Sequence, residues 1–450
     1  IGRMDLLDGI SNKALEYFSD FSDANNDQYL STQARLQHGQ TLEAMGEVAY
    51  SRGKTDEAKA ALLAAREKLL PVHNEQPDNL ELLKTLGANA FWLGQIQYDA
   101  KNWLAVKPEF ELYYSYSQAM YKIAPDSVDA LMELSYATNS LGSLAMKLQE
   151  FEQATAFFDE SLNLKLLAKT KDPDNTALMA DIADTRSWLA SAALAKGDIY
   201  KAIAVHQQIQ VDFESQNKDD EADAYLLDKV FSSYSILAAI YNYQGLTKKA
   251  FELEYQAHEL LKKAAKQDPS NKGWQGNLLH QKVRLMRLNA LLRDPRVTYT
   301  PEALKQELDR KKEEFGSELR FLRAYNNWLL ESARYYQVIG QSLKSAEFAA
   351  AALAYYDKLY ADDSNNQGLI LAMAEASLLQ AMHYKMQSED GNSHKSCARV
   401  RALLEPLQIK DKTPDYIQPY ARALSCLNEL EQHPELQQLL QKSAIVLTTF

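Results

Sequence analysis

Residues 45–58 read Met-Gly-Glu-Val-Ala-Tyr-Ser-Arg-Gly-Lys-Thr-Asp-Glu-Ala, and the small residues of this stretch return at intervals of 48 residues. The first of them, Gly46, is followed on this grid by Gly94, Gly142, Ala190 and Ala238. The last, Ala58, is followed by Val106, Ala154, Ala202 and Ala250. A spacing kept over about 250 residues predicts one structural unit that is repeated in series.

Each unit is predicted to be a hairpin of two helices. A small residue at a fixed place in one helix lets a neighbouring helix approach closely. Seven residues later, Gly53, Gly197 and Gly245 tolerate the positive φ at which many helices end. The second helix begins at once, and a polar break stops it. These breaks read Pro77-Asp78-Asn79, Pro173-Asp174-Asn175 and Pro269-Ser270-Asn271.

This order of residues resembles the tetratricopeptide repeat. The matching residues are Met45, Gly46, Gly53, Ala58, Leu62 and Ala65 in the first unit, and Leu141, Gly142, Ala154 and Phe158 in the third. The family's repeat has about 34 residues, so the longer period adds about two turns to each helix. The resemblance implies an all-α fold, an α-α superhelix or right-handed solenoid of antiparallel helix hairpins. Long-helix variants of this kind are similar to the repeat regions attached to membrane-bound signalling proteins of bacteria.

The pattern predicts one continuous solenoid in three parts. Residues 1–30 hold an amphipathic helix, 4–20, that caps the first repeat, residues 31–270 hold the regular 48-residue repeats, and residues 271–450 hold degenerate repeats and a C-terminal cap. In the last part we expect helices at 274–292 and 301–314, a recognisable unit near Trp328, and hairpins at 367–407 and 414–446. No stretch has the composition of a linker between separate domains.

Composition and motifs argue against catalysis. The chain of 450 residues has a net charge of −12, which disfavours nucleic acid as a partner because phosphate backbones are repelled. Apart from Gly273 and Gly276, no two glycines lie closer than seven residues, so glycine-rich phosphate loops and nucleophile elbows are excluded. Eight scattered histidines and two cysteines offer no zinc motif. We therefore expect no catalytic residue, no metal, no cofactor and no membrane span.

The resemblance also implies a binding groove. In tetratricopeptide arrays the first helix of each hairpin lines a concave surface, at places that can be counted from the small residue as position 8. The predicted lining consists of Glu43, Glu47, Tyr50, Phe91, Gln95, Tyr98, Tyr136, Asn139, Ser143, Met146, Asp184 and Ser187. Rings, amides and hydroxyls of this kind suit a peptide backbone, while the Lys and Asn with which some members clamp a C-terminal carboxylate are missing. The alternative is that Phe91, Tyr136 and Met146 are core between helices.

Three functions stay open. The first is a non-catalytic interaction or sensor module that binds a segment of a partner protein in the groove. The second is the regulatory, extracytoplasmic part of a membrane signalling enzyme whose kinase, cyclase or DNA-binding head is missing, because the chain begins at Ile1 rather than with Met. The third is a self-associating scaffold.

The two cysteines bear on the compartment. Cys397 and Cys426 lie at about the same distance from the predicted loop between two antiparallel helices, so a disulfide can form if their Cβ atoms face one another. Two buried free thiols are the alternative. A bridge would favour an oxidising space such as the periplasm, and without a bridge a cytoplasmic location stays open.

Overall fold

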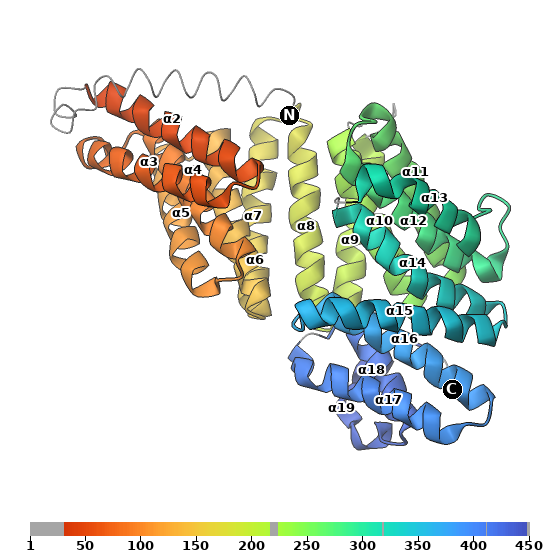
Figure 1. Cartoon of the computed structure of the whole chain (residues 1–450). Coiled ribbons are helices and arrows are strands. Elements are labelled where there is room, and N and C mark those ends of the chain that lie inside the picture. The colour runs from red at the N-terminus through yellow and green to blue at the C-terminus, as the bar shows by residue number, and fades with distance from the viewer. Residues whose placement is uncertain (1–30, 217–223, 317–318, 411, 448–450) are drawn as a thin grey trace. The chain divides into compact units, whose positions relative to one another are not determined.

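The computed structural model describes residues 31–216, 224–316, 319–410 and 412–447. In these residues eighteen α-helices and two short 3₁₀ helices follow one another, with no strand among them. Neighbouring helices pair into hairpins that follow one another along the chain (Figure 1). The all-α array of hairpins that the resemblance implied is therefore confirmed. The predicted capping helix at 4–20 lies outside the described residues.

The helices keep the sequence period to the end of the chain. They are α2 (Thr32–Ser51), α3 (Thr55–Glu75), α4 (Leu80–Asp99), α5 (Trp103–Ile123), α6 (Val128–Lys147), α7 (Phe151–Lys171), α8 (Ala177–Ala195), α9 (Ile199–Gln216), α10 (Ala224–Tyr243), α11 (Thr247–Gln267), α12 (Lys272–Leu292), α13 (Pro301–Phe315), α14 (Leu319–Val338), α15 (Ser342–Asp362), α16 (Gln367–Met386), α17 (Asp390–Leu404), α18 (Pro414–Cys426) and α19 (Pro434–Lys442), with η2 (Glu405–Lys410) and η3 (Leu430–Gln432). The even-numbered helices, which open the hairpins, begin 47 to 49 residues apart.

Side-chain caps fix where these first helices begin. The side-chain oxygen of Asn79 accepts a hydrogen bond from the backbone N–H of Leu82 at 3.1 Å. This bond satisfies an N–H that the helix itself leaves without a partner. The same cap is made by Ser31, Ser127, Asn271 and Asn366. Two of the predicted polar breaks, those at Asn79 and Asn271, therefore end in a cap of this kind.

A residue with left-handed backbone separates the two helices of most hairpins. Gly53, Gly197, Gly245 and Gly340 have φ between 74° and 79°. At the corresponding place in other hairpins, Gln149 and Ser388 have φ of 59° and 60° although both carry a Cβ. The left-handed region costs such a residue about 1–2 kcal/mol.

The substitutions Gln149→Gly and Ser388→Gly are each expected to raise the free energy of unfolding by about 0.5–1 kcal/mol. Glycine removes the left-handed strain, and this gain exceeds the flexibility that it adds to the unfolded chain. In the reverse control, Gly340→Ala should lower the free energy by about 1 kcal/mol. No atom lies within 4 Å of a Cβ added there, so backbone strain alone explains the loss. Urea unfolding of the variants measures all three values, and a destabilised Gln149→Gly would contradict the prediction.

The small residue of each regular first helix packs against the second helix of its own hairpin. A Cβ built on Gly46 would lie 2.5 Å from Cγ of Leu62, and one built on Gly142 would lie 2.6 Å from Cε1 of Phe158. Both partner side chains are fully buried. The close approach of helices that the 48-residue spacing predicted is confirmed at these hairpins.

In the next two hairpins, a polar side chain takes the place of Leu62 and Phe158. His206 is fully buried, and its Nδ1 lies 3.1 Å from Oγ of Ser233. Burial lowers the pKa of His206 to about 4, so the ring is neutral near pH 7. Glu254 is fully buried as well, and its Oε1 lies 3.1 Å from Nε of Arg284. Glu254 of α11 therefore holds Arg284 of the following helix α12 against this hairpin.

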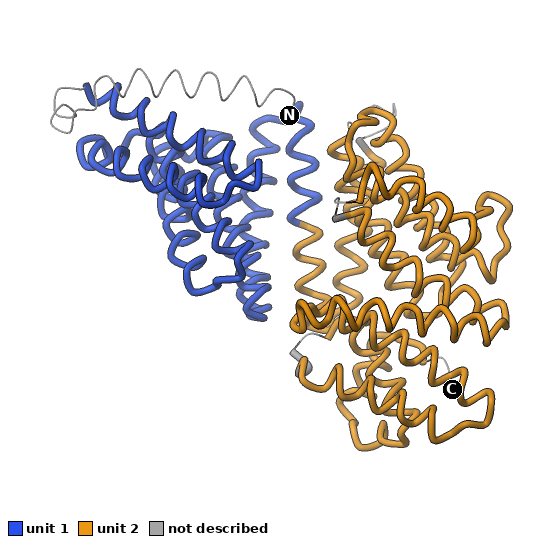
Figure 2. The backbone as a smooth tube through the Cα atoms, viewed as in Figure 1, with its two compact units in different colours: residues 1–185 blue, residues 186–450 orange. Residues whose placement is uncertain are grey.

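The chain forms two compact units, residues 1–185 and residues 186–450 (Figure 2). The boundary between the units lies within α8. It does not coincide with the place near residue 270 where the sequence pattern weakens. The helix packing of the second unit changes near that place, because α12 packs directly against α14 and the short α13 contacts both.

The C-terminal end of the second unit returns to its beginning. The backbone N–H of Lys412 donates to the carbonyl of Ala195 at the end of α8, at 3.0 Å. The N–H of Val446 donates to the carbonyl of Tyr243 at the end of α10, at 2.9 Å. Helices α10 and α18 are also in contact. The hairpins of this unit therefore enclose space on their inner side.

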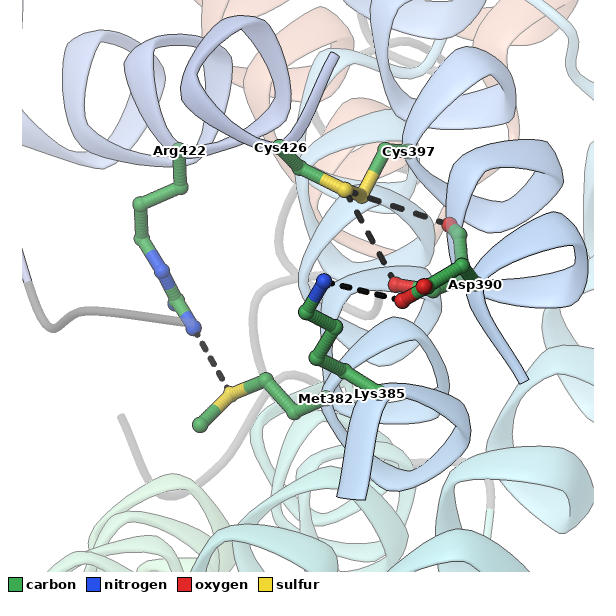
Figure 3. The surroundings of a disulfide bond; sticks show 7 residues. Met382, Lys385, Asp390, Cys397, Arg422 and Cys426 are labelled. Atoms are coloured by element: carbon green, nitrogen blue, oxygen red, sulfur yellow. Dashed lines mark hydrogen bonds and ion pairs between the residues drawn. A yellow bond between two sulfur atoms is a disulfide. The ribbon is translucent and has the colours of Figure 1, made fainter. Parts of the chain in front are cut away.

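A disulfide joins Cys397 of α17 to Cys426 at the end of α18, with a Cα–Cα distance of 6.3 Å (Figure 3). Cys397 is fully buried. The bridge is therefore the correct one of the two interpretations of these cysteines, and the pair of free thiols is wrong. It links the last two hairpins of the second unit.

Candidate functional site

The twelve residues predicted to line a groove lie on the first helices α2, α4, α6 and α8. None of them is fully buried, and Glu47 and Tyr136 are exposed. Eleven belong to the first unit, while Ser187 lies just beyond the boundary on α8. The counting that selected them therefore chose one partly exposed side of the first helices, which we call the inner face. Its role in binding stays a prediction.

Hydrogen bonds run along this inner face from one hairpin to the next. The hydroxyl of Tyr50 donates to Oδ2 of Asp99 at 2.5 Å, and that of Tyr136 donates to Oδ2 of Asp181 at 2.9 Å. Each bond joins residues of consecutive first helices. These hydrogen bonds hold the rings of Tyr50 and Tyr136 in place and leave their hydroxyls and the partner carboxylates at the surface.

Two of the predicted groove rings take part in the core. The ring centroids of Phe91 and Tyr98 both lie 6.3 Å from that of Phe110 on α5, and Phe91 lies 5.7 Å from Tyr113. Both rings are half-buried beside these partners. Phe91 therefore belongs to the packing between helices, as the alternative interpretation expected. Tyr136 is more exposed and keeps its hydroxyl at the surface.

The two units differ in charge. Residues 1–185 contain 16 Lys and Arg against 28 Asp and Glu, whereas residues 186–450 contain 33 of each class. The entire net charge of −12 therefore belongs to the first unit. On its inner face, burial and the neighbouring Glu47 raise the pKa of Glu43 to about 7.

Replacing Glu43 by Gln is expected to stabilise the protein above pH 7 and to have little effect near pH 5. Because its folded-state pKa of about 7 lies above the ordinary 4.5, the folded chain binds this proton more tightly than the unfolded chain. Stability therefore falls as the pH rises from about 5 to 7, and the neutral Gln avoids that loss of about 1–3 kcal/mol. Melting temperatures at pH 5 and pH 8 measure the effect.

The exposed Glu67 on α3 provides the control for this prediction. Glu67→Gln removes the same charge from the second helix of the same hairpin, so it should change stability equally at both pH values. A Glu43→Gln variant that behaves in the same way as the control would show that Glu43 ionises normally.

The second unit contains a pocket of about 690 Å³. Counting positions from the small residue reaches Ser235 and Asn242 of its lining, but the sequence interpretation did not predict a separate pocket. It is lined mainly by the first helices α10, α12, α14, α16 and α18. The position counting that gave the inner face of the first unit, continued past residue 270, lands on lining residues: His280, Arg287, Asn327, Arg334, Gln337, Glu375 and Met382. The sequence therefore carries a signal for this pocket, although the small residues that fix the repeat positions become irregular past residue 270.

A chain of ion pairs crosses the pocket wall. Nε of Arg287 lies 2.7 Å from Oε2 of Glu331, and Nη1 of Arg334 lies 2.5 Å from Oε1 of the same carboxylate. Arg334 also lies 3.2 Å from Glu375, which in turn lies 3.7 Å from Arg422. Four helices are connected in this way. Arg422 also donates to Sδ of Met382 (Figure 3).

The two buried carboxylates of this region titrate differently. Burial acts to raise the pKa of Glu331, but the attraction of Arg334 and Arg287 outweighs it and holds the pKa below its ordinary value. Burial raises the pKa of Glu254 to about 7 even though Arg284 opposes the shift. Glu331 is therefore a fixed negative charge, whereas Glu254 is close to half-protonated at neutral pH.

One arginine of the pocket stands apart from these pairs. Arg323 of α14 is exposed to the pocket, and it has no hydrogen bond or ion pair within the part of the chain that the structure describes. Desolvation in the pocket wall, and then repulsion from Arg284, lower its pKa. His280 lies nearby, where burial followed by Arg323 and Arg284 lowers its pKa and keeps it neutral.

Within the described residues, no group of three or more His, Cys, Asp and Glu is arranged to hold a metal ion. None of the described helices combines the length and the apolar character that a membrane span requires.

No known family model matches the sequence, and no curated protein matches it either. Among solved structures, the chain is similar to BtubC from P. vanneervenii, with 17% identity over 57% of this chain and 92% of that one and a TM-score of 0.37. It is similar to a signal transduction ATPase from Pyrococcus horikoshii that has a tetratricopeptide repeat sensor, with 15% identity over 86% of this chain and a TM-score of 0.37. The chain spans 55% of the length of that ATPase. Human IFIT1, solved with m7Gppp-AAAA, shows 14% identity over 98% of this chain and 94% of that one, with a TM-score of 0.34. These likenesses are too distant to indicate what this protein binds.

Proposed function

We propose that this protein is a non-catalytic binding module that holds a basic segment of a partner protein on the inner face of its first unit. The observation that supports the proposal is the row of partly exposed side chains on α2, α4 and α6, whose positions recur every 48 residues and are mostly polar, with Phe91 and Met146 as the apolar members. A row of carboxylates, amides and hydroxyls provides acceptors for a peptide backbone along its length.

The charge of the first unit selects the partner. All of the net charge of −12 belongs to residues 1–185, and Glu47 and Asp184 place part of it on the inner face. A segment rich in Lys and Arg complements this face, and the field of the whole unit would speed its association. An acidic segment would be repelled.

Fluorescence anisotropy with two matched sets of 12-residue peptides, one basic and one acidic, tests the proposal. We expect the basic set to bind, and the double charge reversal Glu47→Lys and Asp184→Lys to weaken binding at least tenfold. The control reverses the exposed Glu67 and Asp159 on the second helices, which changes the net charge equally. Equal loss in the control would show general attraction to an acidic protein, and binding of neither set would refute the proposal.

The double substitution Phe91→Ala and Tyr98→Ala is a further test that separates binding from packing. Because both rings pack against Phe110, we expect this variant to lose stability as well as binding, with a melting temperature lowered by several degrees. Circular dichroism follows folding and anisotropy follows binding. A variant that keeps its melting temperature but loses binding would assign the two rings to the partner rather than to the core.

The proposal also covers the absence of catalytic activity and the compartment in which the protein works. We infer that the chain is not itself an enzyme and that it works outside the reducing cytosol, in a space such as the periplasm, because the last hairpins carry a disulfide. A regulatory role beside a membrane-bound signalling enzyme is consistent with that compartment. That nucleic acid is not a partner stays a prediction, which the negative charge of the first unit supports and the second unit, with a net charge of zero, does not.

A further inference from the structure

We propose that the pocket of the second unit binds a small organic anion, whose carboxylate or phosphate group is held by Arg323 beside Arg284. This site is separate from the inner face of the first unit. Both arginines lie on first helices, Arg284 on α12 and Arg323 on α14.

The charged side chains of the pocket have an excess of positive charge that an anion could neutralise. Five arginines line it, and the carboxylates that pair with them are Glu254, Glu331 and Glu375. Asp415 is a further acidic residue of the lining. Even with Asp415 counted, positive charge exceeds negative charge, and the excess grows when Glu254 is protonated at about pH 7.

The excess is concentrated at one place. Arg323 is the pocket arginine without a partner in the described residues, and the charged neighbour that acts on it is Arg284, which has the same sign. Two guanidinium groups that repel one another are both stabilised by an anion between them. The planar fork of a guanidinium also fits the two oxygens of a carboxylate or phosphate.

The rest of the pocket suits an apolar body. Leu291 and Val338 line it while 60% and 37% of their surface is exposed, which is unusual for large apolar side chains. Leu291 follows Arg284 by seven residues on α12, a rise of about 10 Å. A volume of about 690 Å³ lies in the range of small-molecule sites. The ligand therefore has an anionic group at one end and an apolar part that reaches toward Leu291.

Titration of the full chain with 2-naphthoate, 2-naphthyl phosphate and 2-naphthol tests this inference, because the three probes share one ring system and differ in the head group. Calorimetry should show saturable binding of at least one anion with a stoichiometry of one. Its Kd should be at least tenfold lower than that of the neutral naphthol, since charge-assisted bonds are the stronger ones. The two anionic probes show whether carboxylate or phosphate is preferred.

Arg323→Gln should weaken binding of the preferred anion at least tenfold, and Arg323→Lys should weaken it less. The melting temperature should not change, because Arg323 takes part in no ion pair of the described structure. The control is Arg320→Gln, on the same helix but outside the pocket lining, which should bind as the unchanged protein does. The inference is overturned if neither anion saturates, if naphthol binds as tightly, or if Arg323→Gln binds normally. Because these variants leave the first unit untouched, this outcome is independent of the peptide experiment.

Discussion

Loss of the disulfide between Cys397 and Cys426 is expected to lower the free energy of unfolding of the second unit by about 3–4 kcal/mol. The bridge closes a stretch of 29 residues, and the entropy that a loop of this size removes from the unfolded chain corresponds to that value. It also holds α18, which contacts α10. Urea unfolding with and without a thiol reductant measures the effect, as does the double variant Cys397→Ala and Cys426→Ala.

Two controls make this result specific. Reductant should not change the stability of the double alanine variant, because that protein has no bridge to lose. Titration of denatured, unreduced protein purified from an oxidising compartment should find no reactive thiol, because the chain contains two cysteines. Two reactive thiols in that titration would contradict the bridge and, with it, the support for a periplasmic location.

The second large effect is expected from Gly142→Leu. A Cβ at this position would already lie 2.6 Å from the ring of Phe158, which is fully buried and cannot move aside easily. Overfilling a helix contact of this kind typically costs 1–3 kcal/mol, and the rest of the leucine side chain adds to the clash. The melting temperature should fall by several degrees.

Gln149→Leu serves as the matched control. It places the same side chain at the turn of the same hairpin, where Gln149 already has a left-handed backbone, so the new residue meets no additional backbone strain. Its melting temperature should stay within about one degree of the original. Equal melting temperatures of the Gly142 and Gln149 variants would show that the small residue does not mark the helix contact.

The hairpins were predictable from the sequence because each of their marker residues determines the local geometry of the chain around it. A glycine that meets Phe158, a left-handed residue before the second helix and an Asn cap at the next break each impose one local geometry. Their recurrence at a fixed interval makes the same geometry recur. The period also persists to α18, where the sequence markers are weak, since helix lengths and caps are kept after the small residues have changed.

The candidate sites were less predictable. Counting positions selected the partly exposed side of α2, α4 and α6, but it could not distinguish Tyr136, which keeps its hydroxyl at the surface, from Phe91, which packs against Phe110. The distinction depends on the neighbouring helix α5. The repeat positions reach several lining residues of the pocket in the second unit. The closure of that pocket depends on contacts between residues far apart in the sequence, such as the bond from Val446 to Tyr243, and a local pattern contains no information on such contacts.

The bonds from Lys412 and Val446 to the ends of α8 and α10 change how the second unit should unfold. In an open array of repeats each hairpin contacts its neighbours alone, so the chain can fray from one end and its stability is roughly a sum over repeats. Here the segments before and after the last hairpin bond to the ends of α8 and α10, so fraying from the C-terminal side of this unit must first break these bonds. Amide exchange in α10 and α18 should therefore proceed through a common opening reaction. Deleting the residues after Lys442 should weaken protection at Tyr243 and Gln244, although these lie about 200 residues earlier in the chain.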